Sequence, residues 1–434
     1  MSGAIGGLLS SFSIRPTASL VMNLDATVGA MPGSNITTSA SFDGSTQYLS
    51  LTSSSAFIQT GDFTVEAWYY PTNVTGSHSL FTLGPDPDNR YVFFLDGTSV
   101  ASNLYGGGVT TYTSTVPINT WTHIAVVRSG TTVSVYINGT ASATTDTQSG
   151  TLGNGALTIG ADANNGALFV GNISNFRMTN TAVYTGNFVA PTTTLRAVTG
   201  TQVLLPLTAT VFTDMSSNML TVTNTGTVAT TAAAPTLAAA TTDFTGTYAI
   251  TTANAGASIA YNSANGGVFR KSTSSGTDSM VLGPNYVTGQ SYSVFMAYKI
   301  SATSAGRLLN TQSEASKDWL LGAYNGHPKA FYPNFSVNLP STGADTVWHF
   351  SWGTFNTGTS LGQLYTATST QPTSTSFTGT NSGGGGFNQL RLFSRSGGVE
   401  VQTADIGMIR VYNGVVTLAQ VQSQYAAFKA RFGY

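Results

Sequence analysis

The stretch that decides the fold is NTWTHIAVVRSGTTVSVYINGTASA, residues 119–143. It predicts two short β-strands, the first over residues 121–128 and the second over residues 132–137. Polar and apolar residues alternate along the second strand, and Asn138-Gly139 follows it directly. Period-two alternation that ends in Asn-Gly is the strongest short-range signal for a β-hairpin. We therefore expect antiparallel β-structure here.

Segments on both sides of this hairpin have the same character. FTVEAWYY begins at Phe63, LTIGA at Leu157 and GNISNFRMTNTAVYTGNF at Gly171. In this order they resemble the laminin-G-like (LamG), concanavalin A-like lectin/glucanase fold, in the version common in bacteriophage virion proteins. The resemblance covers about residues 20–205. It implies a jelly-roll β-sandwich and is much less specific about function.

A second copy follows the first. YSVFMAYK at Tyr292 matches FTVEAWYY, Trp348 matches Trp121, and DIGMIRVYN at Asp405 matches NISNFRMTN. These segments lie about 230 residues apart, a spacing typical of whole domains rather than solenoid units. We predict an all-β fold of two tandem concanavalin A-like jelly-roll β-sandwiches with a C-terminal helix. The predicted boundaries are 1–18 for an N-terminal arm, 19–200 for the first sandwich and 201–434 for the second.

The second copy has more residues before its Tyr292 strand than the first has before Phe63. Much of the excess lies in residues 213–240 and 253–289, which are rich in Thr, Ala, Gly and Ser. We expect these segments to be long surface loops. The alternative is a dedicated binding insertion, because long loops carry function more often than short ones.

A helix is predicted over residues 417–431 at the end of the chain. Thr417 and Gln420 have the spacing of a capping box. Apolar residues follow at helical spacing, namely Leu418, Val421, Tyr425 and Phe428. We expect this apolar stripe to pack on the second sandwich.

The amino-acid composition limits the classes of molecule that the protein could bind. Of 434 residues, 41% are hydrophobic and only 8% are charged, and the formal net charge is −1. This balance removes the electrostatic basis for binding nucleic acid or an anionic membrane. The chain has no cysteine, which favours folding in a reducing cytoplasm. No Lys or Arg precedes the apolar patch at residues 5–14, so we expect synthesis in a host cytoplasm without a signal peptide.

The sequence gives little support for a catalytic function. Glycosidases of this fold need two carboxylates close together, but Glu occurs only at Glu66, Glu314 and Glu400. Glu66 has no acidic partner two residues away, so we expect a solvent-facing or locally paired strand residue. His123 and His349 fall at nearly equivalent positions in the two copies, which favours a structural role. We predict no catalytic residues and no enzyme activity.

Calcium is the only cofactor that the sequence leaves open, because many lectin-like sandwiches bind it through loop oxygens. The oxygen-rich clusters are Asp86, Asp88 and Asn89 in one loop and Asp162 in another. Each cluster also fits an Asx turn between strands. We favour the turn.

Glycan binding would use exposed aromatic rings that stack on sugar faces. The candidates in loop-like stretches are Tyr105, Tyr112, Trp319 and Tyr324. Because the chain has 19 Tyr and 23 Phe, most aromatic residues must belong to the core.

The predicted function is that of a non-enzymatic virion structural protein. It would be a capsid decoration or cement protein, or a tail-appendage subunit, of a tailed phage, with lectin-like domains exposed on the particle. We expect residues 1–18 to dock onto other virion proteins and the chain to form homo-oligomers in the particle. The alternative is a carbohydrate-binding adhesin or tail-fibre receptor-binding protein that recognises host surface glycans. A degenerate glycosidase is a third reading, which the missing carboxylates disfavour.

Overall fold

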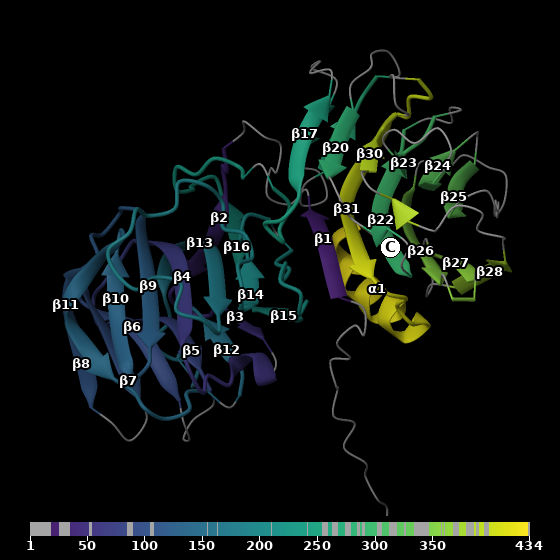
Figure 1. Ribbon diagram of the computed structural model, residues 1–434. Helices are drawn as coiled ribbons and strands as arrows, with labels where there is room; N and C mark the ends of the chain where they lie inside the picture. The colour runs from purple at the N-terminus through teal and green to yellow at the C-terminus, as the bar shows by residue number, and fades with distance from the viewer. Residues whose placement is uncertain are drawn as a thin grey trace, which may run out of the picture.

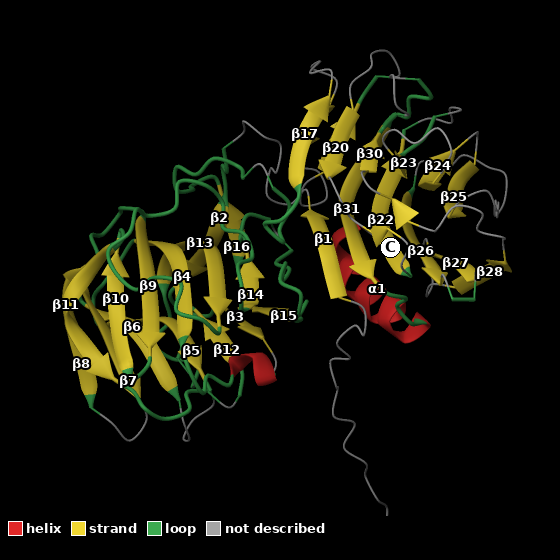
Figure 2. Ribbon diagram, in the orientation of Figure 1, coloured by secondary structure: helices red, strands yellow, loops and turns green. Residues whose placement is uncertain are grey.

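The computed structural model describes residues 19–25, 35–51, 54–84, 90–104, 108–153, 155–162, 164–209, 211–240, 242–253, 259–262, 268–273, 279–283, 287–288, 291–301, 306–311, 319–324, 327–333, 347–356, 358–359, 361–367, 373–378, 386–387, 390–394 and 399–432. Over these ranges the chain forms two β-sandwiches side by side (Figure 1). Helix is confined to η2 (Ser55–Phe57) and α1 (Leu418–Phe432) among these residues (Figure 2).

The first sandwich consists of two antiparallel sheets. One has the order β11(Thr140–Thr147)-β10(Thr132–Ile137)-β9(Thr122–Ser129)-β4(Phe63–Pro71)-β13(Val170–Thr179)-β2(Ser39–Asp43)-β16(Ala229–Thr231), with β14(Thr201–Leu205) also on β13. The other has the order β15(Val222–Thr225)-β3(Tyr48–Leu51)-β12(Leu157–Ile159)-β5(Ser77–Leu83)-β6(Tyr91–Asp96)-β7(Ser99–Leu104)-β8(Val109–Thr115). The predicted hairpin is β9 and β10, with Ile137 opposite Ile124.

Alternation along β4 explains how its sheet is covered on both faces. Phe63, Val65 and Ala67 point into the core between the two sheets. Successive side chains of a strand point to opposite faces, so Glu66 and Trp68 lie on the face that points away from this core. We call this surface of the β4-containing sheet the outer face.

The second sandwich repeats this plan. Its larger sheet has the order β18(Ile259–Asn262)-β19(Val268–Lys271)-β31(Ala404–Asn413)-β22(Tyr292–Ile300)-β26(Trp348–Asn356)-β27(Leu361–Ala367)-β28(Thr373–Thr378), with β1(Ser19–Asp25) also on β31. The facing sheet has the order β17(Ala249–Ala253)-β20(Ser279–Gly283)-β30(Leu390–Leu392)-β23(Leu309–Thr311)-β24(Trp319–Tyr324)-β25(His327–Pro333). A small pair is formed by β21(Val287–Thr288) and β29(Gly386–Phe387).

Strand pairing confirms the alignment of the two copies. Arg177 of β13 lies opposite Glu66 of β4, and Arg410 of β31 lies opposite Phe295 of β22. The two arginines therefore hold the same position in their sheets. The architecture is that of tandem concanavalin A-like jelly-roll sandwiches.

Strand β1 belongs to the second sandwich although it opens the described chain. It runs antiparallel to β31, from Ser19 opposite Asn413 to Asp25 opposite Met408, and lies beside β31 in Figure 1. In the first sandwich β14 holds the corresponding place on β13. After β31 the chain continues into α1, so the place that β14 fills in the first sandwich is left to β1.

Sheet membership therefore departs from the expected boundaries in two places. β1 falls within the range 19–200 expected for the first sandwich but completes the second. β14, β15 and β16 fall within the range 201–434 but pair with strands of the first. The segments 213–240 and 253–289, expected as surface loops, instead supply strands β15, β16 and β18 to β21 within the described residues. The physical reason is that Thr-rich segments suit strands as well as loops. The predicted arm, residues 1–18, lies outside the described residues.

The C-terminal helix forms as predicted. Thr417 Oγ1 accepts a hydrogen bond from the Gln420 backbone N–H at 3.3 Å, and Gln420 Oε1 accepts one from the Thr417 N–H at 2.7 Å. Val421 and Tyr425 are buried against the second sandwich. Leu418 is 40% exposed, so the predicted stripe is wrong at its first position. No helix among the described residues has the length and apolar character needed to cross a membrane.

Candidate functional site

A buried ionic network lies on the outer face of the first sandwich. Glu66 Oε1 accepts hydrogen bonds from Nε and Nη2 of Arg177, at 2.9 and 2.5 Å. Glu66 Oε2 lies 3.1 Å from His123 Nε2 and accepts a 2.8 Å hydrogen bond from the Tyr184 hydroxyl. A carboxylate only accepts hydrogen bonds, so His123 Nε2 carries a proton here. Neighbouring positions on β4, β9 and β13 bring the three charged or ionisable groups together.

This network keeps Glu66 ionised. Burial raises its pKa, but the Arg177 charge and the His123 hydrogen bond outweigh burial and lower the pKa to about 2. Burial and the neighbouring Glu66 charge raise the pKa of Tyr184, which keeps its hydroxyl a donor. Both carboxylate oxygens are fully engaged by donors, so the group is held as a structural anion. The expectation that Glu66 is paired is confirmed, whereas a solvent-facing position is wrong.

An aromatic cover closes over the network. The ring of Tyr184 stacks on Phe188 at 3.5 Å between centroids, and Phe188 meets His123 edge-on at 5.9 Å. The cover is held by the hairpin turn at Gly139, whose carbonyl accepts a 2.9 Å hydrogen bond from the Phe188 N–H. The network is therefore shielded from solvent and is not itself a ligand site.

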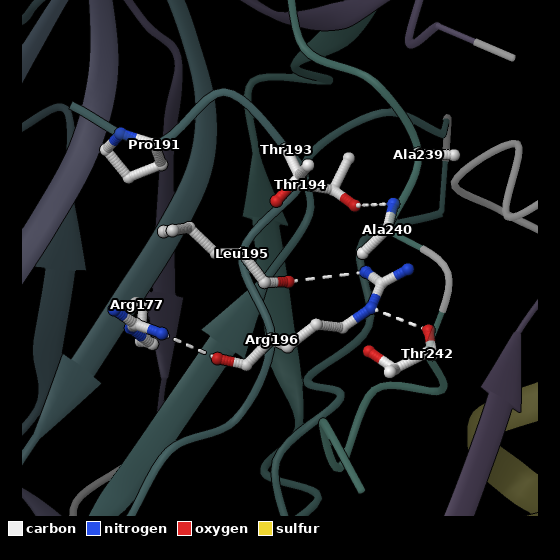
Figure 3. Close-up of a pocket in the computed structure, with 9 residues that line it drawn as sticks. All are labelled: Arg177, Pro191, Thr193, Thr194, Leu195, Arg196, Ala239, Ala240 and Thr242. Carbon is white, nitrogen blue, oxygen red and sulfur yellow. Dashed lines mark hydrogen bonds between the residues drawn. The ribbon is translucent and has the colours of Figure 1, made fainter. Parts of the chain in front are cut away.

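Beside the network lies a pocket of about 380 Å³ (Figure 3). Two chain segments form its walls, with residues 191 and 193–196 in one and residues 239, 240 and 242 in the other. They are joined by hydrogen bonds from the Thr194 N–H to the Ala238 carbonyl at 3.0 Å and from the Ala240 N–H to Thr194 Oγ1 at 3.1 Å. The lining residues are Arg177, Pro191, Thr193, Thr194, Leu195, Arg196, Ala239, Ala240 and Thr242.

Arg196 is the notable side chain of this pocket. Its Nε donates to the Thr242 carbonyl at 3.0 Å and its Nη1 to the Leu195 carbonyl at 3.3 Å. The guanidinium lies 4.3 Å from the ring centroid of Phe244. The third nitrogen, Nη2, is shielded from solvent and has no hydrogen-bond partner. Burial lowers the pKa of Arg196 to about 10, against the opposing effect of Asp243, so the group stays charged at neutral pH.

The network and the pocket are connected. Arg177 Nη1 donates to the Arg196 carbonyl at 2.6 Å, as Figure 3 shows. Arg177 thus ties the pocket wall to Glu66. A pocket supported in this way has a fixed main chain and one polar side-chain atom without a partner.

None of the glycan candidates within the described residues lines this pocket. Tyr112 is 1% exposed and packs in the first core, so it cannot stack on a sugar. This candidate is wrong because its strand β8 turns the ring inward. Tyr324 ends β24 and is half-buried, with the Arg307 guanidinium 4.8 Å from its ring centroid. Trp319 begins β24 opposite Pro333, and Tyr105 lies outside the described residues.

Asp162, the calcium candidate within the described residues, does not line the pocket. Asp162 Oδ1 accepts hydrogen bonds from the backbone N–H groups of Asn164 and Gly166, at 3.0 and 2.7 Å. This is the expected Asx turn. Asp86, Asp88 and Asn89 lie outside the described residues. Within the part of the chain that the structure describes, no group of three or more His, Asp or Glu side chains could hold a metal ion.

The two histidines that seemed equivalent lie on opposite faces of their sheets. His123 lies opposite Trp68 on the outer face, whereas His349 lies opposite Tyr298, which points into the second core. A shift of one residue moves a side chain to the other face of a sheet. Sequence reasoning also missed Arg177 and Arg196. The signal for Arg177 was a lone cation within the apolar strand ISNFRM, and Arg196 had no distinctive pattern around it.

Comparisons with known proteins bear on the fold. Residues 43–185 match the family model Laminin_G_3, described as the concanavalin A-like lectin/glucanases superfamily. No curated protein matches the chain at a significant level.

Solved structures show distant likeness. A Bacteroides ovatus protein named for carbohydrate binding is 15% identical, with a TM-score of 0.39 over 48% of this chain, which spans 63% of that protein. Domain 4 of the arabinanase AbnA from Geobacillus stearothermophilus, in complex with arabinotriose, is 16% identical, with a TM-score of 0.32 over 42% of this chain and 90% of that one. Mouse laminin α1 domains LG4-5 are 10% identical, with a TM-score of 0.28 over 88% of this chain and 91% of that one. By its family match over residues 43–185 and its strand order, the first sandwich resembles concanavalin A-like lectin/glucanase domains.

Proposed function

We propose that the protein binds carbohydrate through its first sandwich without cleaving it, as a structural component on the surface of a virion. The observation that carries the binding proposal is the pocket lined by residues 191, 193–196, 239, 240 and 242 and by Arg177. It lies on a domain whose family includes lectins and glucanases. Threonine hydroxyls and a guanidinium in its lining are groups that fix the orientation of a polar ligand.

The state of Glu66 favours binding over hydrolysis. A glycosidase needs one carboxyl group that gives up a proton and another that attacks or activates water. Glu66 instead has a pKa of about 2 and accepts four hydrogen bonds from Arg177, His123 and Tyr184. Its position under the aromatic cover keeps it from any substrate.

The virion proposal rests on the resemblance of the sequence to phage virion proteins and on the near-neutral, weakly charged chain. The particle would carry it as a capsid decoration, a cement protein or a tail appendage. Docking through residues 1–18 and homo-oligomers in the particle belong to the same proposal. A free adhesin, or a receptor-binding protein on a tail fibre, is the alternative.

A glycan array on the full chain tests the binding proposal. We expect binding that is lost in Thr193→Trp, because Thr193 is exposed and lines the pocket. Thr192→Trp is the matched control, since Thr192 is exposed but does not line it. An array without any bound glycan would refute the binding function, and binding unaffected by Thr193→Trp would move it away from the pocket.

Labelling of the protein on purified particles tests the virion proposal. Signal on the capsid lattice supports a decoration or cement protein, and signal on the tail supports an appendage. Absence of the protein from particles would favour the free adhesin.

A further inference from the structure

We infer that the pocket beside Arg196 recognises an acidic sugar, with the sugar carboxylate bound by the Arg196 guanidinium. This inference rests on the proposed carbohydrate-binding function and names the ligand class of the same pocket. It is carried by the geometry of one buried cation and of the groups that surround it.

Arg196 is held in place but incompletely satisfied. Only 8% of the residue is exposed, and two of its three guanidinium nitrogens donate to main-chain carbonyls. Its contact with Phe244 fixes the plane of the guanidinium. A buried charged donor without an acceptor destabilises the structure that holds it. An acceptor that enters the pocket would remove this cost, which makes Nη2 an attractive point for a ligand.

One of the existing hydrogen bonds of Arg196 can be exchanged for a bond to a ligand. The hydrogen bond from Nη1 to the Leu195 carbonyl is long, at 3.3 Å, whereas the bond from Nε to Thr242 is 3.0 Å. The binding that we infer requires the guanidinium to rotate so that Nη1 and Nη2 together face the pocket. Paired guanidinium N–H groups match the two oxygens of a carboxylate.

The surrounding charges leave Arg196 available to an anion. Arg177 is paired with Glu66. Asp243 is the acidic neighbour of Arg196, but its carboxylate already accepts hydrogen bonds from the backbone N–H groups of Asn23 and Tyr248 and from the Thr245 hydroxyl. No hydrogen bond joins Asp243 to Arg196 among the described contacts. A ligand carboxylate would therefore have this guanidinium as its direct partner.

The size of the pocket suits one sugar ring. Its volume of about 380 Å³ is near the lower end of the range for small-molecule sites, about 300–1,000 Å³. Thr193 at the exposed rim offers a hydroxyl for the remaining ring oxygens. The end of an oligosaccharide fits this space better than the middle of a long polymer.

Calorimetric titration of the full chain tests the inference with matched ligands. The probes are a hexuronic acid oligosaccharide and a sialic acid-terminated oligosaccharide, each as the free acid and as its methyl ester. The ester keeps the sugar and removes the charge. We expect at least one free acid to bind about tenfold or more tightly than its ester, as a charge-assisted pair predicts. The two sugars then tell which carboxylate position fits.

Variants assign the preference to Arg196. Arg196→Gln should bind acid and ester equally, and Arg196→Lys should keep part of the preference because it keeps the charge. Unfolding midpoints show whether these buried variants fold. Thr193→Trp, at an exposed residue, should abolish binding independently, with Thr192→Trp as control.

The outcomes separate the two proposals. Equal binding of acid and ester by the wild type, or an acid preference that survives Arg196→Gln, would overturn this inference and leave carbohydrate binding standing. Binding of neutral sugars alone would do the same. Failure of every carbohydrate to bind would remove the proposed function together with the inference.

Discussion

Asn23 and Arg410 lie opposite each other on adjacent strands, although 387 residues separate them. Arg410 Nε donates to Asn23 Oδ1 at 3.3 Å, and Asn23 is fully buried. The backbone N–H of Asn23 donates to Asp243 at 2.9 Å, and its carbonyl accepts from the Phe244 N–H at 2.8 Å. One strand from the start of the chain thus joins the end of the chain to the connection between the sandwiches.

The second sandwich should depend on β1 for its stability. Leu24 is buried in its core, so Leu24→Ala should lower the free energy of unfolding by about 2–5 kcal/mol. Denaturant unfolding of the full chain followed by tryptophan fluorescence measures this loss. Leu418→Ala is the control, because Leu418 is 40% exposed, and it should change stability by no more than about 0.5 kcal/mol. Similar effects of both variants would contradict the role assigned to β1.

Two truncations should distinguish the role of residues 1–18 from the role of β1. Removal of residues 1–18 leaves β1 intact, and both sandwiches should remain folded. Removal of residues 1–25 takes away the partner of β31 from Met408 to Asn413. We expect the longer truncation to lower the unfolding midpoint of the second sandwich and to increase aggregation, because an unpaired strand edge is exposed. Identical melting curves for the two truncations would show that β1 is dispensable.

Acid should weaken the first sandwich through Glu66. Its pKa is about 2 in the folded protein, against an ordinary value of 4.5. The unfolded chain therefore binds this proton first, and stability is lost as the pH falls from about 4.5 to about 2. The contribution at neutral pH is about 3 kcal/mol.

Glu66→Gln tests this account. The variant should be less stable at pH 7 by about that amount, because Arg177 loses its anion, and its stability should fall less steeply below pH 4.5. The pKa of Asp43 is also lowered, by hydrogen bonds that outweigh its desolvation. Asp43 should therefore contribute to the pH dependence of stability in both proteins. Parallel stability curves for variant and wild type would argue against a buried, ionised Glu66.

Two glycines, one in the turn before β10 and one in the turn after it, should respond differently to replacement by alanine. Both have positive φ, +61° at Gly130 and +82° at Gly139. A Cβ at Gly130 would meet nothing within 4 Å, whereas one at Gly139 would lie 1.9 Å from the Phe188 carbonyl oxygen. Gly130→Ala should cost only backbone strain, about 1 kcal/mol. Gly139→Ala should cost clearly more, since the segment that covers His123 must move. Thermal unfolding compares them, and equal shifts would disprove the close approach.

The cap of α1 should contribute measurably. Thr417→Ala removes the acceptor of the Gln420 N–H and should cost about 1 kcal/mol. Thr417→Ser keeps a hydroxyl at the same place and should be nearly neutral. The unfolding midpoint of the second sandwich is the measurement. A serine variant as unstable as the alanine variant would indicate that the methyl group, rather than the hydrogen bond, matters.

Sequence alone determined the features that depend on neighbouring residues. The alternation ended by Asn138-Gly139 predicted strand β10 and the turn that follows it, and Thr417 with Gln420 predicted the start of α1. The repeated segments predicted two sandwiches of the same kind, because each strand must present an apolar face at the same spacing. These signals are local in origin, so they can be read along the chain.

Only the tertiary structure decided which sheet each edge strand joins and which polar groups are buried. Met22 and Leu24 give β1 an apolar face that would suit either core, and no local rule names β31 as its partner. Tyr112 points inward because of the sheet it joins, and Arg196 lacks a partner for Nη2 because distant segments close around it. Strand partners and burial depend on the packing of residues far apart in the chain, and this packing is the source of the candidate pocket.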